Sequence, residues 1–421
     1  MRNFTKPFLS QLTFHFPRSK KSFYALLSVF SICLLAYNSA SIFSTRVPFP
    51  AKIPPEPAIF SSAIVAGKSR KFFSLPSSAK LSSSSALYSV RDEAPAAKSA
   101  AHMHKNRNLV VPTSGAQKGQ KGFESRVRDF FAGGGGCKLR FFMTWISSSS
   151  DSFGERELFA VTSLFKAHPN MCCCLIIASN SLDSDNGTRI LRPLLDKGFK
   201  VAAFSPDFDY LFKGTPAGEW YNQLMRGNVN PGEVPLGQNL SNLLRLGLLY
   251  KFGGIYLDTD VIVLKSLDGL KNAIGAQTVD RATKIWSRLN NAVMIFDRGH
   301  PLLYKFIQEF ALTFDGNKWG HNGPYMVSRV VSRVAGRPGY RFTIMPPTAF
   351  YPVDWSKIGS LFEGPKGSSH SKWIVAKSRQ IMSKSLGVHL WNKQSRGFEV
   401  QNGSIIQHIM LSSGYNFSTE V

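Results

Sequence analysis

The chain has 421 residues, 43% of them hydrophobic, which is enough for one large domain or two small ones. Its net charge is +25, and residues 1–136 hold 19 Lys and Arg against 5 Asp and Glu, a local net charge of +14. A basic chain can bind nucleic acid, but no recognition helix, zinc-ligand spacing or aromatic RNA-binding motif is present. We therefore expect no nucleic-acid partner.

The N-terminal region predicts a membrane anchor. Residues 1–22 form a basic tail, and residues 23–43 carry no charge. About 20 helical residues span the hydrocarbon core of a bilayer. The basic residues before the segment, with no acid among them, are Arg2, Lys6, Arg18, Lys20 and Lys21. The positive-inside rule then predicts a type II signal anchor with the rest of the chain in a lumen. A signal peptide cleaved near Ala40 and an organelle transit peptide are the alternatives.

Residues 44–136 predict a stem. They are rich in Ser, Ala, Pro and Lys and end in the run Gly133–Gly136. Because they show little periodic apolar pattern, ordering them would bury too little surface to stabilise a fold. We predict that they form a disordered stem between the anchor and a folded domain, residues 137–421.

From Leu139 onward, apolar runs alternate with helical patterns. The predicted strands are Leu139–Trp145, Cys172–Ala178, Lys200–Phe204 and Ile255–Leu257, and the predicted helices are Glu155–Ala167, Gly187–Lys197 and Asn239–Phe252. Gly253 and Gly254 end the last helix. This order predicts an α/β fold with a mostly parallel sheet flanked by helices, which binds ligands at the carboxyl ends of its strands.

The cysteines and glycosylation sequons add little chemistry. Cys172, Cys173 and Cys174 lie in an apolar run and can serve as small apolar residues of a buried strand. A zinc site would need separated pairs of cysteines and histidines at set spacing, which this sequence lacks. A disulfide from Cys137 to this strand is possible in an oxidising compartment. Sequons stand at Asn186, Asn239, Asn402 and Asn416.

Asp258 and Asp260 are the strongest candidates for a functional site. They stand two apart at the end of the apolar run Ile255–Leu257. Side chains two apart on a strand point the same way, and paired carboxylates suit Mg²⁺ or Mn²⁺ that also holds phosphate oxygens. No glycine-rich phosphate loop is present, so phosphates would need the metal. Two solvated acids in a turn are the alternative.

The sequence around this pair resembles a known family. The run Ser241 to Asp260, with Leu-Leu-Arg, Leu-Tyr-Lys, Gly-Gly and Asp-x-Asp, is similar to the DXD sugar transferases of the alpha-1,4-glycosyltransferase family. Further similar blocks are Phe141–Trp145, Leu289–Phe296, His321–Pro324 and Val388–Lys393. Two departures stand out, because family members often carry an acid at the position of Asn242 and Glu-Ser at that of Thr162-Ser163.

The resemblance implies a GT-A-type fold and a retaining glycosyltransferase. Such an enzyme moves a hexose or N-acetylhexosamine from a UDP-sugar to a glycan or glycolipid acceptor in alpha-1,4 linkage. It uses Mn²⁺ or Mg²⁺ and sits in the Golgi membrane with its catalytic domain in the lumen. The resemblance does not indicate which sugar is transferred.

The resemblance also implies roles for single residues. Asp260 would bind the metal directly, and Asp258 would contact the ribose or a metal-bound water. His389 would be a third ligand, or alternatively a histidine packed beside its neighbours. Lys393 would meet the diphosphate, or be an exposed lysine. Arg245 would pair with Asp258 or the nucleotide, or form a structural salt bridge.

Two adjacent amides and several aromatic residues complete the candidates. Asn290 and Asn291 precede an apolar strand and could bind sugar hydroxyls or lie near the anomeric carbon, unless they form an ordinary turn. No carboxylate has the position of a nucleophile, which favours a front-side route. The aromatic residues that could stack on an acceptor sugar are Trp220, Tyr221, Trp319 and Tyr325, and we expect core packing for at least half of them.

Two other functions fit part of the pattern. Asp-x-Asp-x-Val after an apolar strand also opens the haloacid-dehalogenase-type phosphatases, but these need a downstream acidic cluster, and no adjacent acidic pair follows here. The second alternative is an inactive, membrane-tethered sugar-binding protein, which the intact acids and His389 disfavour.

Overall fold

The computed structural model describes residues 122–133, 137–146, 153–169, 172–179, 182 and 185–412. The predicted cytosolic tail and anchor, and most of the predicted stem, lie outside these residues. Within the described ranges, no helix is both long enough and apolar enough to cross a membrane.

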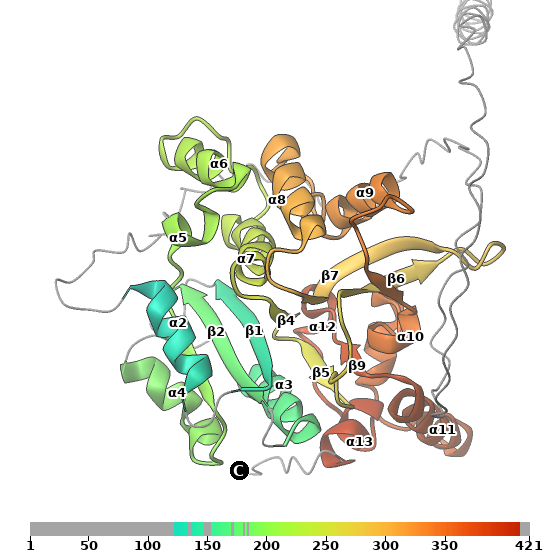
Figure 1. Ribbon diagram of the computed structural model, residues 1–421. Coiled ribbons are helices and arrows are strands. Elements are labelled where there is room, and N and C mark those ends of the chain that lie inside the picture. The colour runs from blue at the N-terminus through green and yellow to red at the C-terminus, as the bar shows by residue number, and fades with distance from the viewer. Residues whose placement is uncertain are drawn as a thin grey trace, which may run out of the picture. The chain divides into compact units, whose positions relative to one another are not determined.

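A seven-stranded mixed sheet forms the centre of the described fold (Figure 1). Its strand order is β3 (Val201–Phe204), β2 (Cys172–Ser179), β1 (Leu139–Ile146), β4 (Gly254–Leu257), β7 (Trp286–Phe296), β6 (Ala273–Val279) and β8 (Thr343–Met345). The pairs from β3 to β4 and the pair β6–β8 are parallel, whereas β7 runs antiparallel to both β4 and β6. The predicted mostly parallel α/β sheet is confirmed.

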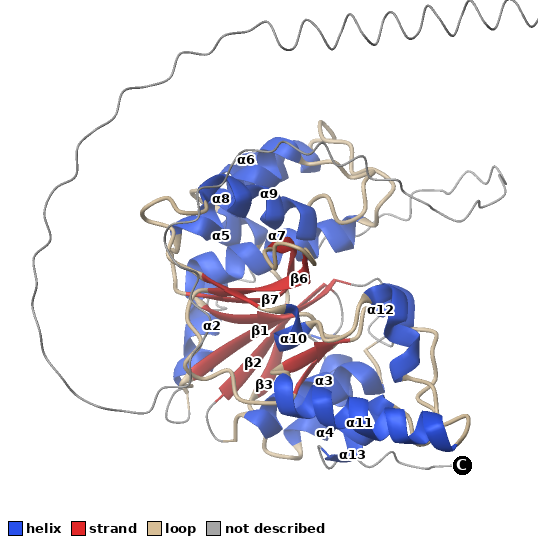
Figure 2. Cartoon of the chain, turned by 90° about the vertical axis from the view of Figure 1, so that its right-hand side faces the viewer, coloured by secondary structure: helices blue, strands red, loops and turns tan. Residues whose placement is uncertain are grey.

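Helices cover both faces of this sheet (Figure 2). One face carries α2 (Phe123–Ala132), α5 (Phe208–Phe212), α6 (Pro216–Met225), α7 (Leu236–Phe252), α8 (Pro301–Thr313) and α9 (Pro324–Val334). The other carries α3 (Glu155–Ala167), α4 (Asp185–Leu195), α10 (Pro347–Phe350), the 3₁₀-helix Trp355–Leu361, α11 (Ser368–Lys384) and α13 (Ile405–Ser412). The period-2 alternation of β1 explains the two cores: Phe141 and Met143 pack on one face and Phe142 on the other.

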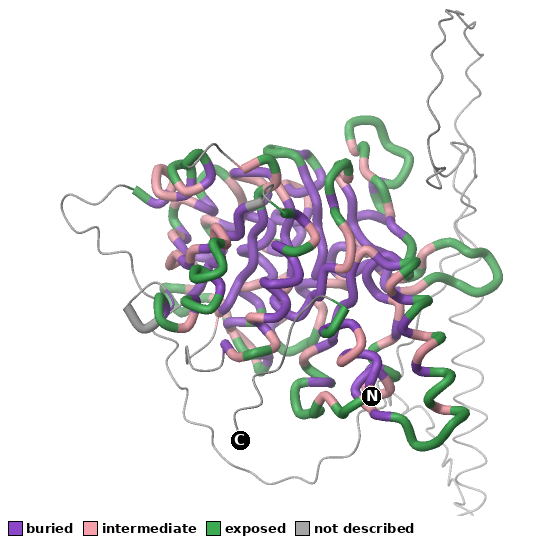
Figure 3. The backbone as a smooth tube through the Cα atoms, turned by 90° about the horizontal axis from the view of Figure 1, so that it is seen from below, coloured by how far each residue is buried: buried purple, intermediate pink, exposed green. Residues whose placement is uncertain are grey.

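Most residues of the sheet and of the helix faces that contact it are buried (Figure 3). All seven predicted elements are present, and their ends agree with the prediction within about three residues. The short helices α5 and α6 and strand β6 had no predicted counterpart, and β7 begins earlier than the apolar strand predicted after Asn291.

The predicted boundary of the stem is wrong. Residues 123–132, assigned to a disordered stem, form α2, and its buried residues Phe123, Val127 and Phe131 pack into the core. The ring of Phe131 lies edge-on to that of Phe142 on β1, with centroids 5.2 Å apart. The helix repeats apolar residues at i, i+4 and i+8, a spacing that marks an amphipathic helix. The folded domain therefore begins no later than Phe123.

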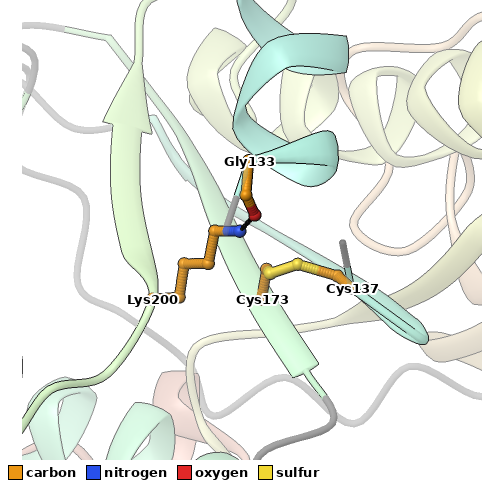
Figure 4. Close-up of a disulfide and its surroundings, with 4 residues drawn as sticks. All are labelled: Gly133, Cys137, Cys173 and Lys200. Atoms are coloured by element: carbon orange, nitrogen blue, oxygen red, sulfur yellow. Dashed lines mark hydrogen bonds between the residues drawn. A yellow bond between two sulfur atoms is a disulfide. The ribbon is translucent and has the colours of Figure 1, made fainter. Parts of the chain in front are cut away.

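A disulfide joins the segment after α2 to the sheet. It links Cys137 to Cys173 on β2, and beside it Lys200 donates a hydrogen bond to the carbonyl of Gly133 (Figure 4). One of the possibilities left open by the sequence is thus realised. Cys174 is buried and lies outside the disulfide.

Strands β1 and β4 are adjacent and parallel. Helix α3, which follows β1, packs on one face of the sheet, and α7, which precedes β4, packs on the other. In open α/β sheets, ligands bind beyond the carboxyl ends of the strands. The turn from α7 into β4 needs glycine: Gly253 has φ +65°, and a Cβ there would lie 2.6 Å from the Arg298 nitrogen.

Candidate active site

The acidic pair lies at the carboxyl end of β4, as predicted. Asp258 follows Leu257 directly, and its N–H donates to the carbonyl of Ala292 at 2.8 Å. The N–H of Val261 then closes a turn onto the Asp258 carbonyl at 3.1 Å. The two acids thus occupy a turn between β4 and β5 (Val261–Val263) rather than the strand itself. They still converge, because the turn folds Asp260 back toward Asp258.

His389 joins the pair from a distant part of the chain. It ends β9 (Gly387–His389), which pairs antiparallel with β5 and sets His389 opposite Val261. The N–H of Leu390 also donates to the Asp260 carbonyl at 2.9 Å. One possible ligand atom from each of Asp258, Asp260 and His389 lies within 4.8 Å of the other two. The three residues that the sequence grouped therefore lie close together, and their role as metal ligands stays a prediction.

The geometry of this cluster suits a divalent cation. Two ligands at right angles around a metal, each about 2.1 Å from it, lie about 3.0 Å apart. Asp260 Oδ1 and His389 Nε2 are 3.2 Å apart. This separation is compatible with two donors to one cation once His389 has lost its proton. Two carboxylates and one imidazole form a donor set compatible with Mn²⁺.

Burial and mutual charge set the protonation of this pair. Burial opposes both charges, yet His389 and the Asn392 N–H, which donates to Asp260 Oδ2 at 2.8 Å, hold the pKa of Asp260 below its usual value. Conversely, burial lowers the pKa of His389, but Asp260 outweighs this and raises it. His389 must lose its proton to bind a metal. Its Nδ1 is buried and has no hydrogen-bond partner among the described residues. Its ring packs edge-on to that of Trp391, with the ring centroids 4.3 Å apart.

Asp258 is held by Arg245. The side chain of Arg245 is 2% exposed, and its Nη1 lies 3.0 Å from Asp258 Oδ1. Arg245 also donates to the carbonyls of Ser241 and Asn291 and covers the ring of Tyr256. Burial raises the pKa of Asp258, although the guanidinium opposes that shift. Of the roles considered for Arg245, the structure shows pairing with Asp258.

A chain of three hydroxyls also links Arg245 to Asp258. Arg245 Nη2 donates to Ser241 Oγ at 3.3 Å, Ser241 and Thr144 are 2.5 Å apart, and Thr144 is 2.7 Å from Tyr256 Oη. Tyr256 donates to Asp258 Oδ1 at 2.7 Å. Because a carboxylate only accepts and each hydroxyl has one proton, the direction is fixed: Ser241 donates to Thr144 and Thr144 to Tyr256. Arg245 and Tyr256 both use Oδ1, so Oδ2 of the 27% exposed Asp258 is the oxygen that can face a ligand.

Sequence reasoning assigned no role to Thr144, Ser241 or Tyr256. A signal existed for Tyr256, because it stands two residues before Asp258 and shares its side of the chain. The contacts of Thr144 and Ser241 depend on how β1 and α7 pack against β4, which no local pattern encodes.

The predicted amides lie inside β7, not before it. Asn290 is 4% and Asn291 2% exposed. Asn290 donates to Gln277 and accepts from the Ala292 N–H, and Asn291 donates to Asn242 at 2.9 Å. Neither forms the ordinary turn that was the alternative. A direct role toward the sugar stays a prediction, since these amides are engaged within the protein.

The four aromatic candidates divide as expected. Trp220 and Tyr221 are 5% and 8% exposed and belong to the core. Trp319 is 45% exposed, and Lys393 Nζ lies 3.6 Å from its ring centroid. Arg288 covers Tyr325 at 4.4 Å. Lys393 therefore lies beside the site, with its charge on an indole ring.

Comparisons with known proteins identify the family. A model described as "Glycosyltransferase sugar-binding region containing DXD motif" matches residues 154–280, and one described as "Alpha 1,4-glycosyltransferase conserved region" matches residues 295–413. Lactosylceramide 4-alpha-galactosyltransferase of Mus musculus is 32% identical over 265 residues, which cover 60% of this chain and 68% of that protein. The chain belongs to the alpha-1,4-glycosyltransferase family.

A second relative and a solved structure are less similar to this chain. Human alpha-1,4-N-acetylglucosaminyltransferase is 26% identical over 214 residues, 48% of this chain and 56% of that protein. Among solved structures, galactosyltransferase LgtC in complex with donor and acceptor sugar analogs has 12% identity and a TM-score of 0.36, covering 67% of this chain and 97% of that one. That structural likeness is low and adds nothing to the assignment. The family makes this chain a glycosyltransferase, so the phosphatase alternative is wrong.

The hydroxyl chain gives a first testable prediction for this glycosyltransferase. Thr144→Val keeps the shape of the side chain but removes the link between Ser241 and Tyr256. Asp258 then loses orientation, and we expect Mn²⁺ to bind about tenfold more weakly in the presence of UDP, the lower end of the range for residues that orient metal ligands. Isothermal titration measures this affinity.

Thr144→Ser should restore binding, because it keeps the hydroxyl. Thr162→Val is the matched control, since Thr162 is 1% exposed and, within the described part of the chain, bonds only to the Leu158 carbonyl of its own helix. An equal loss of Mn²⁺ affinity in both valine variants would show that burial of a hydroxyl, not the chain to Asp258, is responsible.

Proposed function

We propose that this protein is a retaining glycosyltransferase of GT-A type. It transfers a hexose or N-acetylhexosamine from a UDP-sugar to a glycan or glycolipid acceptor in alpha-1,4 linkage. The observation that carries the proposal is the convergence of Asp258, Asp260 and His389 at the carboxyl end of β4. The names of the relatives, a galactosyltransferase and an N-acetylglucosaminyltransferase, support the linkage and leave both donor sugars open.

Asp258, Asp260 and His389 would hold the divalent cation, which we propose to be Mn²⁺ or Mg²⁺. A bound cation of this kind offsets the negative charge that develops on a departing diphosphate. The protein's own residues do the rest. Arg245 and Tyr256 fix Asp258 through Oδ1, and the Asn392 N–H fixes Asp260 through Oδ2. Lys393, one residue further along, has the length and charge to reach a diphosphate beside Asp260.

The positions of Asp280 and Asp297 favour a front-side reaction. Asp280 caps the turn between β6 and β7 by accepting from the N–H groups of Ala282 and Thr283. Asp297 accepts from Asn272 at the far end of β7. Neither is placed to attack an anomeric carbon, so we propose that the departing phosphate takes the proton of the acceptor hydroxyl.

Asp260→Asn tests the function directly. The change keeps the size of the side chain but removes the charge from the proposed metal ligand. We expect turnover to fall at least about a hundredfold, which corresponds to about 3 kcal/mol in the barrier. The measurement is UDP release by the full-length protein, screened against several UDP-sugars with Mn²⁺. Near-normal turnover of this variant at saturating Mn²⁺ would contradict the proposed site, and the absence of UDP release from wild type with every donor would contradict the function.

His389→Ala distinguishes ligation from packing. If His389 binds the metal, the Mn²⁺ concentration for half-maximal activity should rise about ten- to a hundredfold. If it only packs against Trp391, the melting temperature should fall while the Mn²⁺ dependence stays unchanged. Parallel Mn²⁺ titrations and thermal melts of this one variant separate the two roles.

We further propose a single-pass type II protein of the Golgi membrane with a lumenal catalytic domain. The basic N-terminal tail supports this orientation, and the Cys137–Cys173 disulfide fits an oxidising compartment. In sealed microsomes, residues 44–421 should resist added protease until detergent is present. Digestion of the folded domain without detergent would contradict the orientation, and an N-terminus near Ser41 would indicate a cleaved signal peptide.

A further inference from the structure

Trp319 is an exposed indole at the edge of the candidate site. It lies in the loop between α8 and α9 and is 45% exposed, whereas Trp220 on α6 is 5% exposed. Its neighbour across the contact is Lys393, and the residue before Lys393 donates its N–H to Asp260. The indole is therefore within one lysine side chain of the proposed metal site.

The loop that carries Trp319 is firmly built. Asn322 accepts from the N–H of Asp315 and donates to its carbonyl, and it also donates to the buried Asn239 on α7. The N–H of Val234 donates to the carbonyl of Gly316 at 2.8 Å. Because Trp319 is 45% exposed, much of this large apolar ring lies outside the core. It can bind a flat ligand at small entropic cost.

Lys393 covers one face of this ring. Its Nζ lies 3.6 Å from the ring centroid, a distance typical of a cation–π contact. Partial burial lowers the pKa of Lys393. A diphosphate offers charge-assisted hydrogen bonds, which are stronger than one exposed cation–π contact. A diphosphate at Asp260 would therefore draw Lys393 off the indole.

We propose that the face of Trp319 beneath Lys393 is the stacking surface for the acceptor sugar, and that donor binding uncovers it. A pyranose presents an apolar face of C–H groups that matches an indole ring. Lys393 occupies that face in the free protein and moves to the diphosphate when the donor enters. The acceptor would then bind well only after the donor. This inference rests on the proposed function, since it requires a nucleotide diphosphate at the acidic pair.

The binding of p-nitrophenyl β-lactoside to the full-length protein tests the proposal. We expect wild type to bind this sugar at least about tenfold more tightly with UDP and Mn²⁺ than without them. Lys393→Met keeps the length but removes the charge, so that variant should bind the lactoside equally well with and without UDP. An affinity of wild type that does not depend on UDP, or no binding of the lactoside with UDP and Mn²⁺, would overturn the proposal.

Aromatic substitutions test the stacking surface itself. Trp319→Ala should weaken lactoside binding about tenfold with UDP and Mn²⁺ present, whereas Trp319→Phe should stay within about threefold of wild type. Trp373→Ala is the matched control, because Trp373 is 43% exposed but lies on α11 against His370. The stacking assignment fails if Trp319→Ala binds the lactoside as wild type does, or if Trp373→Ala loses as much.

The affinity for UDP separates this inference from the function on which it rests. UDP should bind Trp319→Ala with Mn²⁺ about as tightly as it binds wild type. If UDP binds both proteins but the lactoside response is missing, only the inference about Trp319 fails. If UDP binds neither, the proposed donor site fails with it.

Discussion

The buried ion pair between Arg245 and Asp258 is the contact on which the candidate site depends. An arginine that is 2% exposed has lost nearly all its hydration, so its charge must be matched within the protein. Its fork of donors reaches the carbonyls of Ser241 and Asn291 as well as Asp258, which a lysine could not do. Burial makes such a pair a weak source of stability but a strong constraint on position. The position that it fixes is that of Asp258.

The remaining parts of the site converge on this constraint. Gly253 and Gly254 let α7 pass directly into β4, so Arg245 and Asp258 share one continuous helix–strand unit. Thr144 on β1 ties the neighbouring strand to the same carboxylate through Tyr256. The pairing of β5 with β9 then delivers His389 to Asp260. Three chain regions must therefore fold together before the three potential ligands meet.

A row of buried amides joins α7 to β7 and to the loop between α8 and α9. Asn239 and Asn242 lie one turn apart on α7, where they accept from Asn322 and Asn291 respectively. Gly323 packs so closely on Asn242 that a Cβ there would lie 2.8 Å from its Oδ1. An acid at position 242 could accept the same hydrogen bond from Asn291. The departure at Asn242 thus preserves the contact. Burial of Asn239, 2% exposed, also excludes glycosylation at that sequon in the folded protein.

The sequence determined the features that depend on local order. Alternating apolar runs gave the strands and helices around β1 to β4, and the spacing of Asp258 and Asp260 after an apolar strand indicated the acidic site. These signals are short-range, because strand alternation, helix caps and paired acids are set by neighbours within a few residues. The family resemblance added His389, which no spacing could connect to Asp260.

Only the tertiary structure decided which polar groups face a ligand and which serve the fold. Asn290 and Asn291 have the residue types of a sugar site, but β7 turns them toward Gln277 and Asn242. Phe123 to Phe131 carry helical apolar spacing in a region whose composition predicted disorder, and the sheet gives that helix a surface to cover. The physical reason is common to both. Burial and hydrogen-bond partners arise from contacts between segments that are distant in the sequence. Composition and local spacing do not predict such contacts.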